Sequence, residues 1–262
     1  MDKISLQYIA GLIDGSGDLV LERTIDKYGV PRVNRLLEIN LGKTREAGRI
    51  LKKLQLQLGG IGSVTHRENT LKFSTRANIA KALSQVIPFL YIKYSRAKWL
   101  LSECGLTNSE KPLSTTIEES NRHIELFKQA IDGDDFDYSE LSFPAREWWA
   151  GLIDSAGFIT ILPKTFAVKV VVPLKVSSVT KYLTSSELSY FTQFSNYMLI
   201  KQHTSIKEFL EKIYPHILVK TQLVDLALER LNLCSSLKFG LSQYDDMLRI
   251  YNKVKPLRFE NY

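Results

Sequence analysis

Residues 8–17 read Y-I-A-G-L-I-D-G-S-G, and residues 148–157 read W-W-A-G-L-I-D-S-A-G. The five letters A-G-L-I-D are identical, and the second stretch follows the first by 140 positions. A second pair of stretches occurs in the same order, I-P-F-L-Y-I-K at 87–93 and Y-P-H-I-L-V-K at 214–220, with the offset reduced to 127. We interpret the chain as an internal duplication whose second copy is 13 residues shorter between these landmarks.

The first copy predicts the order α-β-β-α-β-β-α, because helix-period and strand-period segments alternate between glycine and proline turns. Its expected helices are 5–14, 44–58, 79–87 and 93–104, and its expected strands are 19–24, 32–41, 61–66 and 70–74.

The second copy predicts the same order more loosely, and we expect it to lack a full second hairpin. Its expected helices are 145–154, 185–194, 205–213 and 220–234, with strands near 158–162, 167–176 and 196–202 and a final helix at 241–252. The sequence therefore predicts an α+β fold of two pseudo-symmetric αββαββα lobes, the second lobe shortened.

Charge divides the chain into three parts. Residues 1–105 hold 17 basic and 9 acidic side chains, residues 106–143 hold 3 and 9, and residues 144–262 hold 15 and 10. We expect a first repeat at 1–105, an acidic connector at 106–143 with one helix near 121–132, and a second repeat with the C-terminal helix at 144–262. Two basic lobes favour a polyanionic partner, most simply nucleic acid.

Several protein classes are excluded by composition. A content of 44% hydrophobic and 24% charged residues excludes wholesale disorder. Cys104 and Cys234 form no disulfide framework or metal-binding pair, and the four histidines lack metal-ligand spacing. No apolar run reaches the length of a membrane span, so no membrane association is expected.

The repeated stretches at 9–17 and 149–157 resemble the LAGLIDADG motif of homing endonucleases and the related intron maturases. The segments L-G-G-I-G-S at 58–63 and I-P-F at 87–89 also resemble recurring segments of that family, so the resemblance covers nearly all of the first copy. Two copies in one chain resemble its monomeric, two-repeat members. The resemblance implies paired motif helices, a saddle of strands that lies in the DNA major groove, and divalent metals held where the motif helices end.

Small residues in both motifs indicate that the two helices pack closely. A glycine inside a helix costs about 1 kcal/mol relative to alanine, so its repetition implies a contact between backbones. The expected interface residues are Ala10, Gly11, Ala150 and Gly151. At the helix ends, we interpret Asp14 and Asp154 as structural polar contacts, with a remnant of the metal site as the alternative.

The acidic residues that bind metal in LAGLIDADG nucleases are replaced in both motifs of this chain. Family nucleases carry one carboxylate at the eighth motif position, because Mg²⁺ requires oxygen ligands and phosphodiester hydrolysis requires a metal to activate water. Those positions hold Ser16 and Ala156. Asp18 is the nearest substitute, but it begins a strand and its counterpart is Phe158. We therefore predict a catalytically inactive protein with no metal or cofactor, and Mg²⁺ only if the chain is an endonuclease.

Strand alternation predicts which residues form the saddle. These are Asp18, Val20, Glu22 and Thr24 in the first lobe and Phe158, Thr160, Leu162 and Lys164 in the second. Few of them suit base reading in B-DNA, which favours another ligand or a protein. The candidate nucleic-acid-binding residues are Arg32, Arg35, Lys72, Arg76, Lys93, Lys164, Lys169, Lys175 and Lys220, with a solvated polar surface as the alternative interpretation.

Four functions remain open. The first is an inactive protein that binds structured RNA as a splicing helper or ribosome-assembly factor, with Tyr91, Tyr94 and Trp99 either stacking on bases or packing in the core. The second is a structural component of a ribonucleoprotein such as an organellar ribosome. The third is a homing endonuclease, and the fourth is a non-cleaving DNA-binding derivative. The resemblance implies a mitochondrial or chloroplast location, and a motif helix that starts by residue 5 leaves no room for a transit peptide.

Overall fold

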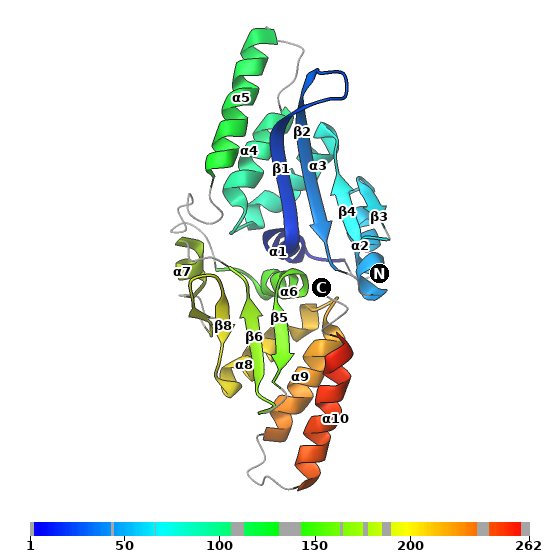
Figure 1. Cartoon of the computed structure of the whole chain (residues 1–262), viewed down its shortest axis with the longest axis vertical. Helices are drawn as coiled ribbons and strands as arrows, with labels where there is room; N and C mark the ends of the chain where they lie inside the picture. Colours follow the sequence, from blue (N-terminus) through cyan, green and yellow to red (C-terminus); the bar gives the residue numbers. More distant parts are fainter. Residues whose placement is uncertain are drawn as a thin grey trace.

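The computed structural model describes residues 3–42, 45–65, 67–105, 113–130, 143–162, 165–174, 178–184, 190–234 and 241–257. Two lobes lie end to end, each with an antiparallel four-stranded sheet, and a pair of helices runs between them (Figure 1). The predicted α+β fold of two lobes is confirmed.

The first lobe begins with α1, which ends directly at the first strand. Its elements are α1 (Leu6–Ser16), β1 (Gly17–Ile25), β2 (Pro31–Asn40), α2 (Arg45–Gln57), β3 (Ser63–Thr65), β4 (Thr70–Phe73), α3 (Arg76–Val86), the short helix η1 (Ile87–Phe89) and α4 (Tyr94–Gly105). The strand order is β1-β2-β4-β3. A helix, α5 (Leu113–Gln129), follows this lobe and packs on α4 and β1.

The second lobe repeats this order on shorter strands. Its elements are α6 (Arg146–Ser155), β5 (Phe158–Ile161), β6 (Val168–Val172), α7 (Ser178–Thr184), β7 (Thr192–Gln193), β8 (Met198–Ile200), α8 (His203–Ile213), the short helix η3 (Tyr214–His216) and α9 (Thr221–Cys234). The strand order, β5-β6-β8-β7, matches that of the first lobe. The last helix, α10 (Leu241–Leu257), packs on α9.

The helix expected at 185–194 is wrong for residues 190–194, and residues 185–189 lie outside the described residues. The helix lies earlier, as α7, and Thr192 and Gln193 form the fourth strand of the sheet. The second hairpin is therefore present, although its strands have only two and three residues. The physical reason is the aromatic composition of 190–194, which suits a strand; Phe191 is buried and stacks on Trp149 with ring centroids 5.2 Å apart.

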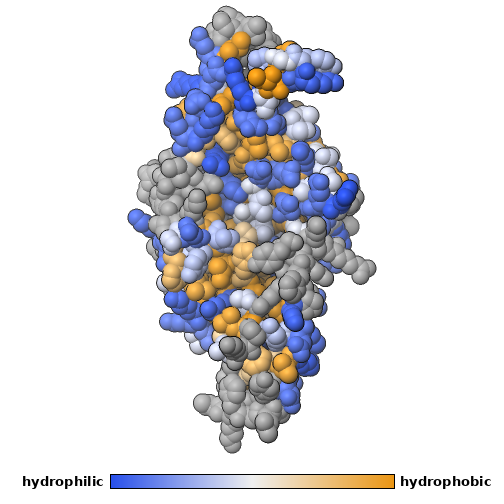
Figure 2. Space-filling view, in the orientation of Figure 1, coloured by the Kyte–Doolittle hydropathy of each residue, from blue (hydrophilic) through white to orange (hydrophobic). Residues whose placement is uncertain are grey.

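Each sheet has one face covered by helices and one face that the helices leave uncovered. On β1 and β2 the residues Leu19 and Leu37 pair on the covered face, while Asp18 and Glu38 pair on the other. The same alternation on β5 buries Ile159 and exposes Phe158. We call the uncovered faces the first and second sheet faces; apolar residues gather over β5 and β6 in the view of Figure 2.

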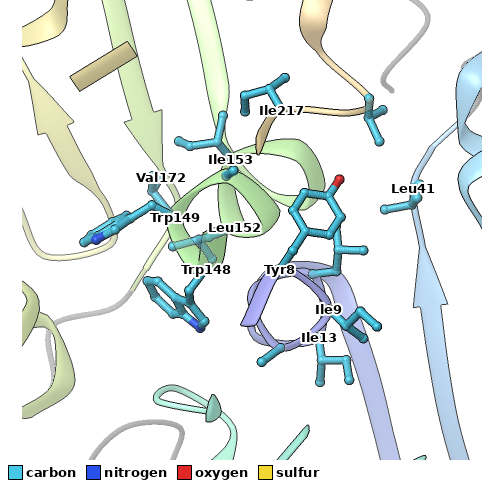
Figure 3. Packing of buried hydrophobic residues seen from close by; sticks show 14 of the residues in the cluster. Tyr8, Ile9, Ile13, Leu41, Trp148, Trp149, Leu152, Ile153, Val172 and Ile217 are labelled. Carbon is cyan, nitrogen blue, oxygen red and sulfur yellow. The ribbon is translucent and has the colours of Figure 1, made fainter. Parts of the chain in front are cut away.

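The helices α1 and α6 form the contact between the lobes, and their central residues, 8–14 and 148–154, are buried there (Figure 3). A Cβ atom on Gly11 would lie 2.1 Å from the carbonyl oxygen of Trp148, and one on Gly151 would lie 2.2 Å from that of Tyr8. The two backbones therefore meet where the sequence repeats its glycine, and Ala10 and Ala150 beside them are fully buried. Among the described residues, none of the helices has the length and apolar content to cross a membrane.

We expect Gly11→Ala or Gly151→Ala to destabilise the protein by about 3 kcal/mol, because the added methyl group displaces a backbone with little freedom to move. Urea unfolding of the full chain measures this. Gly105→Ala is the matched control, since a Cβ there meets nothing within 4 Å, and its effect should stay under about 1 kcal/mol. Equal stability of all three variants would contradict the close contact.

Candidate functional site

Asp14 occupies the end of α1 and is 1% exposed. Its Oδ2 accepts hydrogen bonds from the backbone N–H of Tyr91 at 2.8 Å and from the indole Nε1 of Trp148 at 2.9 Å. Its Oδ1 accepts one from the backbone N–H of Lys93 at 2.8 Å. Burial raises the pKa of this carboxyl group, and the hydrogen bonds oppose part of that rise.

Asp154 has the corresponding place at the end of α6 and is equally buried. Its Oδ2 accepts from the hydroxyl of Tyr8 at 2.7 Å and from the backbone N–H groups of Leu218 and Val219 at 2.7 and 3.0 Å. Its Oδ1 accepts from the backbone N–H of Lys220 at 2.8 Å. Each motif aspartate thus binds an aromatic side chain of the other lobe and the loop before a helix of its own lobe.

Lys93 and Lys220, both predicted to bind nucleic acid, direct their ammonium groups to the ends of the motif helices. The Nζ of Lys93 donates to the carbonyl oxygens of Ile13 at 2.9 Å and Gly17 at 2.6 Å. The Nζ of Lys220 donates to those of Ile153 at 2.7 Å and Gly157 at 2.6 Å. Both ammonium groups therefore stabilise the carboxyl end of a motif helix, where a cation also complements the helix dipole.

The eighth motif positions lie beside a cavity of about 640 Å³ where the two motif helices end. Ser16 donates its hydroxyl to the carbonyl oxygen of Asn40 at 2.5 Å, and Ala156 follows the end of α6 with no polar side-chain atom. The residues around the cavity are Ser16, Asn40, Leu41, Gly42, Asp154, Ser155, Ala156, Gly157, Phe158, Ile159, Thr160, Pro173, Lys220 and Leu223.

These donors do not fit a divalent metal. Mg²⁺ prefers carboxylate and water oxygens in an octahedral shell. Among the described residues around the cavity, Asp154 supplies the one carboxylate, and both of its oxygens are occupied by hydrogen bonds. In the described ranges, no group of three or more His, Cys, Asp or Glu side chains is placed to hold a metal ion. Asp18, the candidate substitute, is exposed on β1 opposite Glu38.

The first sheet face carries three carboxylates, those of Asp18, Glu22 and Glu38, and its cations are partly neutralised. Arg32 binds Asp26 with nitrogen and oxygen 2.8 Å apart, and Lys72 lies 3.6 Å from Glu38. This face therefore offers little net positive charge to a phosphate backbone.

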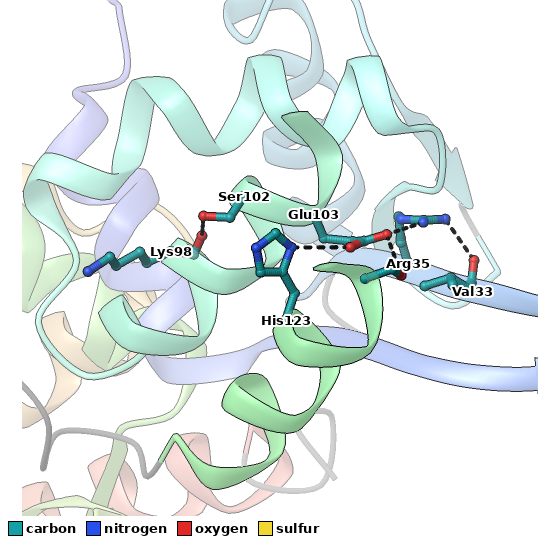
Figure 4. Close-up of polar contacts among 7 residues, drawn as sticks. Val33, Arg35, Lys98, Ser102, Glu103 and His123 are labelled. Atoms are coloured by element: carbon teal, nitrogen blue, oxygen red, sulfur yellow. Dashed lines mark hydrogen bonds and ion pairs between the residues drawn. The ribbon is translucent and has the colours of Figure 1, made fainter. Parts of the chain in front are cut away.

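Arg35, another of the predicted nucleic-acid contacts, lies on the covered face. Its Nη2 binds the fully buried carboxylate of Glu103 on α4, and its Nη1 donates to the carbonyl oxygen of Val33 at 2.9 Å (Figure 4). His123 of α5 lies 3.3 Å from the same carboxylate. The pairing register explains this placement, because Arg35 sits opposite the buried Leu21.

The remaining predicted cations have varied placements. Arg76 is the half-buried first residue of α3, and Lys169 is half-buried on the second sheet face, opposite Thr160. Lys164 and Lys175 lie outside the described residues. The saddle positions Val20 and Thr24 are half-buried on the first sheet face, and Leu162 is half-buried just after β5.

The predicted stacking aromatics face inward or are half-buried. Tyr91 is 7% exposed and meets Trp148 edge to face, with ring centroids 5.2 Å apart. Three residues that the sequence analysis did not select lie instead on the second sheet face or at its end: Phe194, Tyr197 and Lys201. Alternation along the strand expected at 196–202 would have placed Tyr197 and Lys201 on one face.

The two sheets, the paired glycine-contact helices and the aspartates that end them define the two-lobe fold of the LAGLIDADG homing endonucleases. Solved structures with this fold align with nearly the whole length of the chain. "LAGLIDADG homing endonuclease I-GzeII in complex with DNA target" is 15% identical, with a TM-score of 0.71 over 95% of this chain and 97% of that one. I-SmaMI bound to uncleaved DNA target in the presence of calcium ions is 13% identical, with a TM-score of 0.70 over 95% and 98%. I-AabMI bound to uncleaved DNA is 15% identical, with a TM-score of 0.71 over 95% and 98%.

At these identities the likeness shows the fold, and the monomeric two-lobe arrangement is consistent with it. No protein-family model matches the sequence, and no curated protein matches it either.

We expect Asp14→Ala to destabilise the protein by about 3 kcal/mol or more, because three buried donors lose their acceptor and each unpaired donor costs about 1–3 kcal/mol. Urea unfolding measures the loss. Asp18→Ala is the control: this exposed side chain faces Glu38, and its removal should change stability by less than about 0.5 kcal/mol. Similar small effects at both positions would show that the Asp14 contacts are not structural.

Lys220 predicts a pH dependence of stability. Burial lowers the pKa of its ammonium group to about 8, below the value of about 10.5 in an unfolded chain. Between these values the unfolded chain binds more protons, so this residue makes stability rise with pH, with a slope approaching about 1 kcal/mol per pH unit. The stability of wild type relative to Lys220→Met should therefore rise from pH 8 to pH 10, with Lys52→Met as the control for losing an exposed lysine. A difference that stays constant would contradict it.

Proposed function

We propose that this protein binds nucleic acid without cutting it, and that structured RNA is its preferred ligand. The observation that carries the proposal is the donor set at the ends of the motif helices. Ser16 and Ala156 stand at the two positions that bind metal in the LAGLIDADG nucleases which the motifs resemble. The neighbouring aspartates already accept buried hydrogen bonds.

Nucleic-acid binding is supported by the fold and by charge. The solved structures with this fold include complexes with DNA targets. The first 105 residues carry 17 basic and 9 acidic side chains, and residues 144–262 carry 15 and 10. Both lobes are thus cationic overall, as a polyanion partner requires.

Structured RNA is favoured over duplex DNA by the first sheet face. A sheet that enters a major groove lies between two phosphate backbones, where Asp18, Glu22 and Glu38 would be repelled. RNA is recognised through its backbone, its shape and its unstacked loop bases, so it does not require this face to read a groove. A role in splicing or in a ribonucleoprotein, and a location in an organelle, belong to the same proposal.

The second candidate function is duplex DNA binding without cleavage. It is favoured by the DNA complexes of the similar structures and needs only phosphate contacts. An RNA preference and a DNA preference give opposite rankings in one binding experiment.

Fluorescence anisotropy with a labelled RNA hairpin and with a DNA duplex of equal length tests the proposal at matched salt. We expect the RNA to bind at least about tenfold more tightly, a difference of about 1.4 kcal/mol. Tighter binding of the duplex would overturn the RNA preference, and no binding of either would overturn the proposal.

Restoring acids at the motif ends tests the absence of cleavage. We expect neither wild type nor Ser16→Asp with Ala156→Asp to cut a library of DNA duplexes in Mg²⁺, because the first sheet face does not suit the groove. Gel analysis of the products measures this. Efficient cutting by the double variant would show that the scaffold still binds DNA as an endonuclease does, and cutting by wild type would reject the inactive assignment.

A further inference from the structure

The two sheet faces differ in chemistry although their strands pair alike. Carboxylates occupy the first sheet face at Asp18, Glu22 and Glu38. The described residues of the second sheet face include no acid. Those residues include Phe158, Lys169, Val171, Phe194, Tyr197 and Leu199, and Lys201 directly follows β8.

Strand register places the aromatic and basic residues of the second lobe on one side of its sheet. Phe158 pairs with Val171, which pairs with Leu199. Alternation along β8 then puts Tyr197 and Lys201 on the same side as Leu199. Phe194 joins them, because its backbone N–H donates to the carbonyl oxygen of Tyr197 at 2.8 Å.

Two of the aromatic side chains stack on one another, and a lysine lies over one of the rings. The rings of Phe194 and Tyr197 are stacked, with centroids 4.7 Å apart and planes 16° from parallel. The Nζ of Lys201 lies 4.6 Å from the centroid of the Phe194 ring. Tyr197 and Phe158 are each 37% exposed, so part of each ring on this uncovered face is open to solvent.

We propose that the second sheet face binds an unpaired stretch of RNA, with bases stacking on Tyr197 and Phe158 and phosphates contacting Lys169 and Lys201. This inference rests on the proposed function and names the part of the ligand that the second lobe takes. Flat rings interleaved with cations complement unpaired bases joined by phosphates. A duplex hides its base faces and gains nothing from these rings, whereas the acids of the first sheet face repel either form.

The test uses the full-length protein and a fluorescein-labelled single-stranded RNA of about 12 nucleotides, with the matched RNA duplex as the second probe. We expect Tyr197→Thr and Phe158→Thr each to weaken single-strand binding about tenfold while duplex binding changes less than about twofold. Thermal unfolding confirms that each variant is folded. The matched control is Leu36→Thr, opposite Val20 on the first sheet face, which should leave single-strand affinity within about twofold.

Two further measurements do not depend on the ring variants. Lys169→Gln with Lys201→Gln should reduce the slope of log affinity against log salt by about 1.4, the value for two single-strand phosphates. An RNA carrying 2-aminopurine should change its fluorescence on binding wild type, because the probe reports stacking.

Each outcome is decisive. Equal losses for the two probes, equal losses in the first-face control, or an unchanged 2-aminopurine signal would overturn the inference while nucleic-acid binding stands. Tight binding of duplexes alone would overturn both the inference and the RNA preference. Failure of wild type to bind any probe would overturn the proposed function and the inference together.

Discussion

The contact between α1 and α6 determines the rest of the structure. Two helices without side chains at Gly11 and Gly151 bring their backbones together, and this closeness lets each aspartate reach an aromatic side chain of the other lobe. The bonds run crosswise: Trp148 donates to Asp14, and Tyr8 donates to Asp154. Because the same carboxylates also bind the backbone before α4 and α9, one small region fixes the helix pair and the later helices of both lobes.

This arrangement separates the fold from the chemistry. The aspartates that hold the lobes together stand two positions before the places where the resemblance puts metal ligands. Loss of acids at Ser16 and Ala156 therefore leaves every contact of Asp14 and Asp154 in place. A cavity remains at the helix ends, and its lining is neutral apart from Asp154 and Lys220.

The sequence alone predicted what depends on local repetition, and it failed where a distant partner decides. The repeated glycine and the strand alternation of β1 were readable, because each follows from spacing. The fourth strand of the second lobe was missed, since two residues carry no periodic signal. The ion pair of Arg35 could not be read from the sequence, because its partner, Glu103, lies 68 positions away on α4. The role of Lys93 and Lys220 was hidden for the same reason. Their acceptors are backbone carbonyl groups in the distant motifs, and every residue has such a group, so no sequence pattern marks the pairing.

Both lobes belong to one chain, and this has a consequence for how the protein can change. In a homodimer of single lobes, one codon sets the same position on both halves, so a substitution that favours a ligand on one side is imposed on the other. Here Asp18 and Phe158 occupy matching places and are encoded independently. One half of a once-symmetric scaffold is then free to lose its cations while the other gains exposed rings, provided that the helices between them keep their glycines.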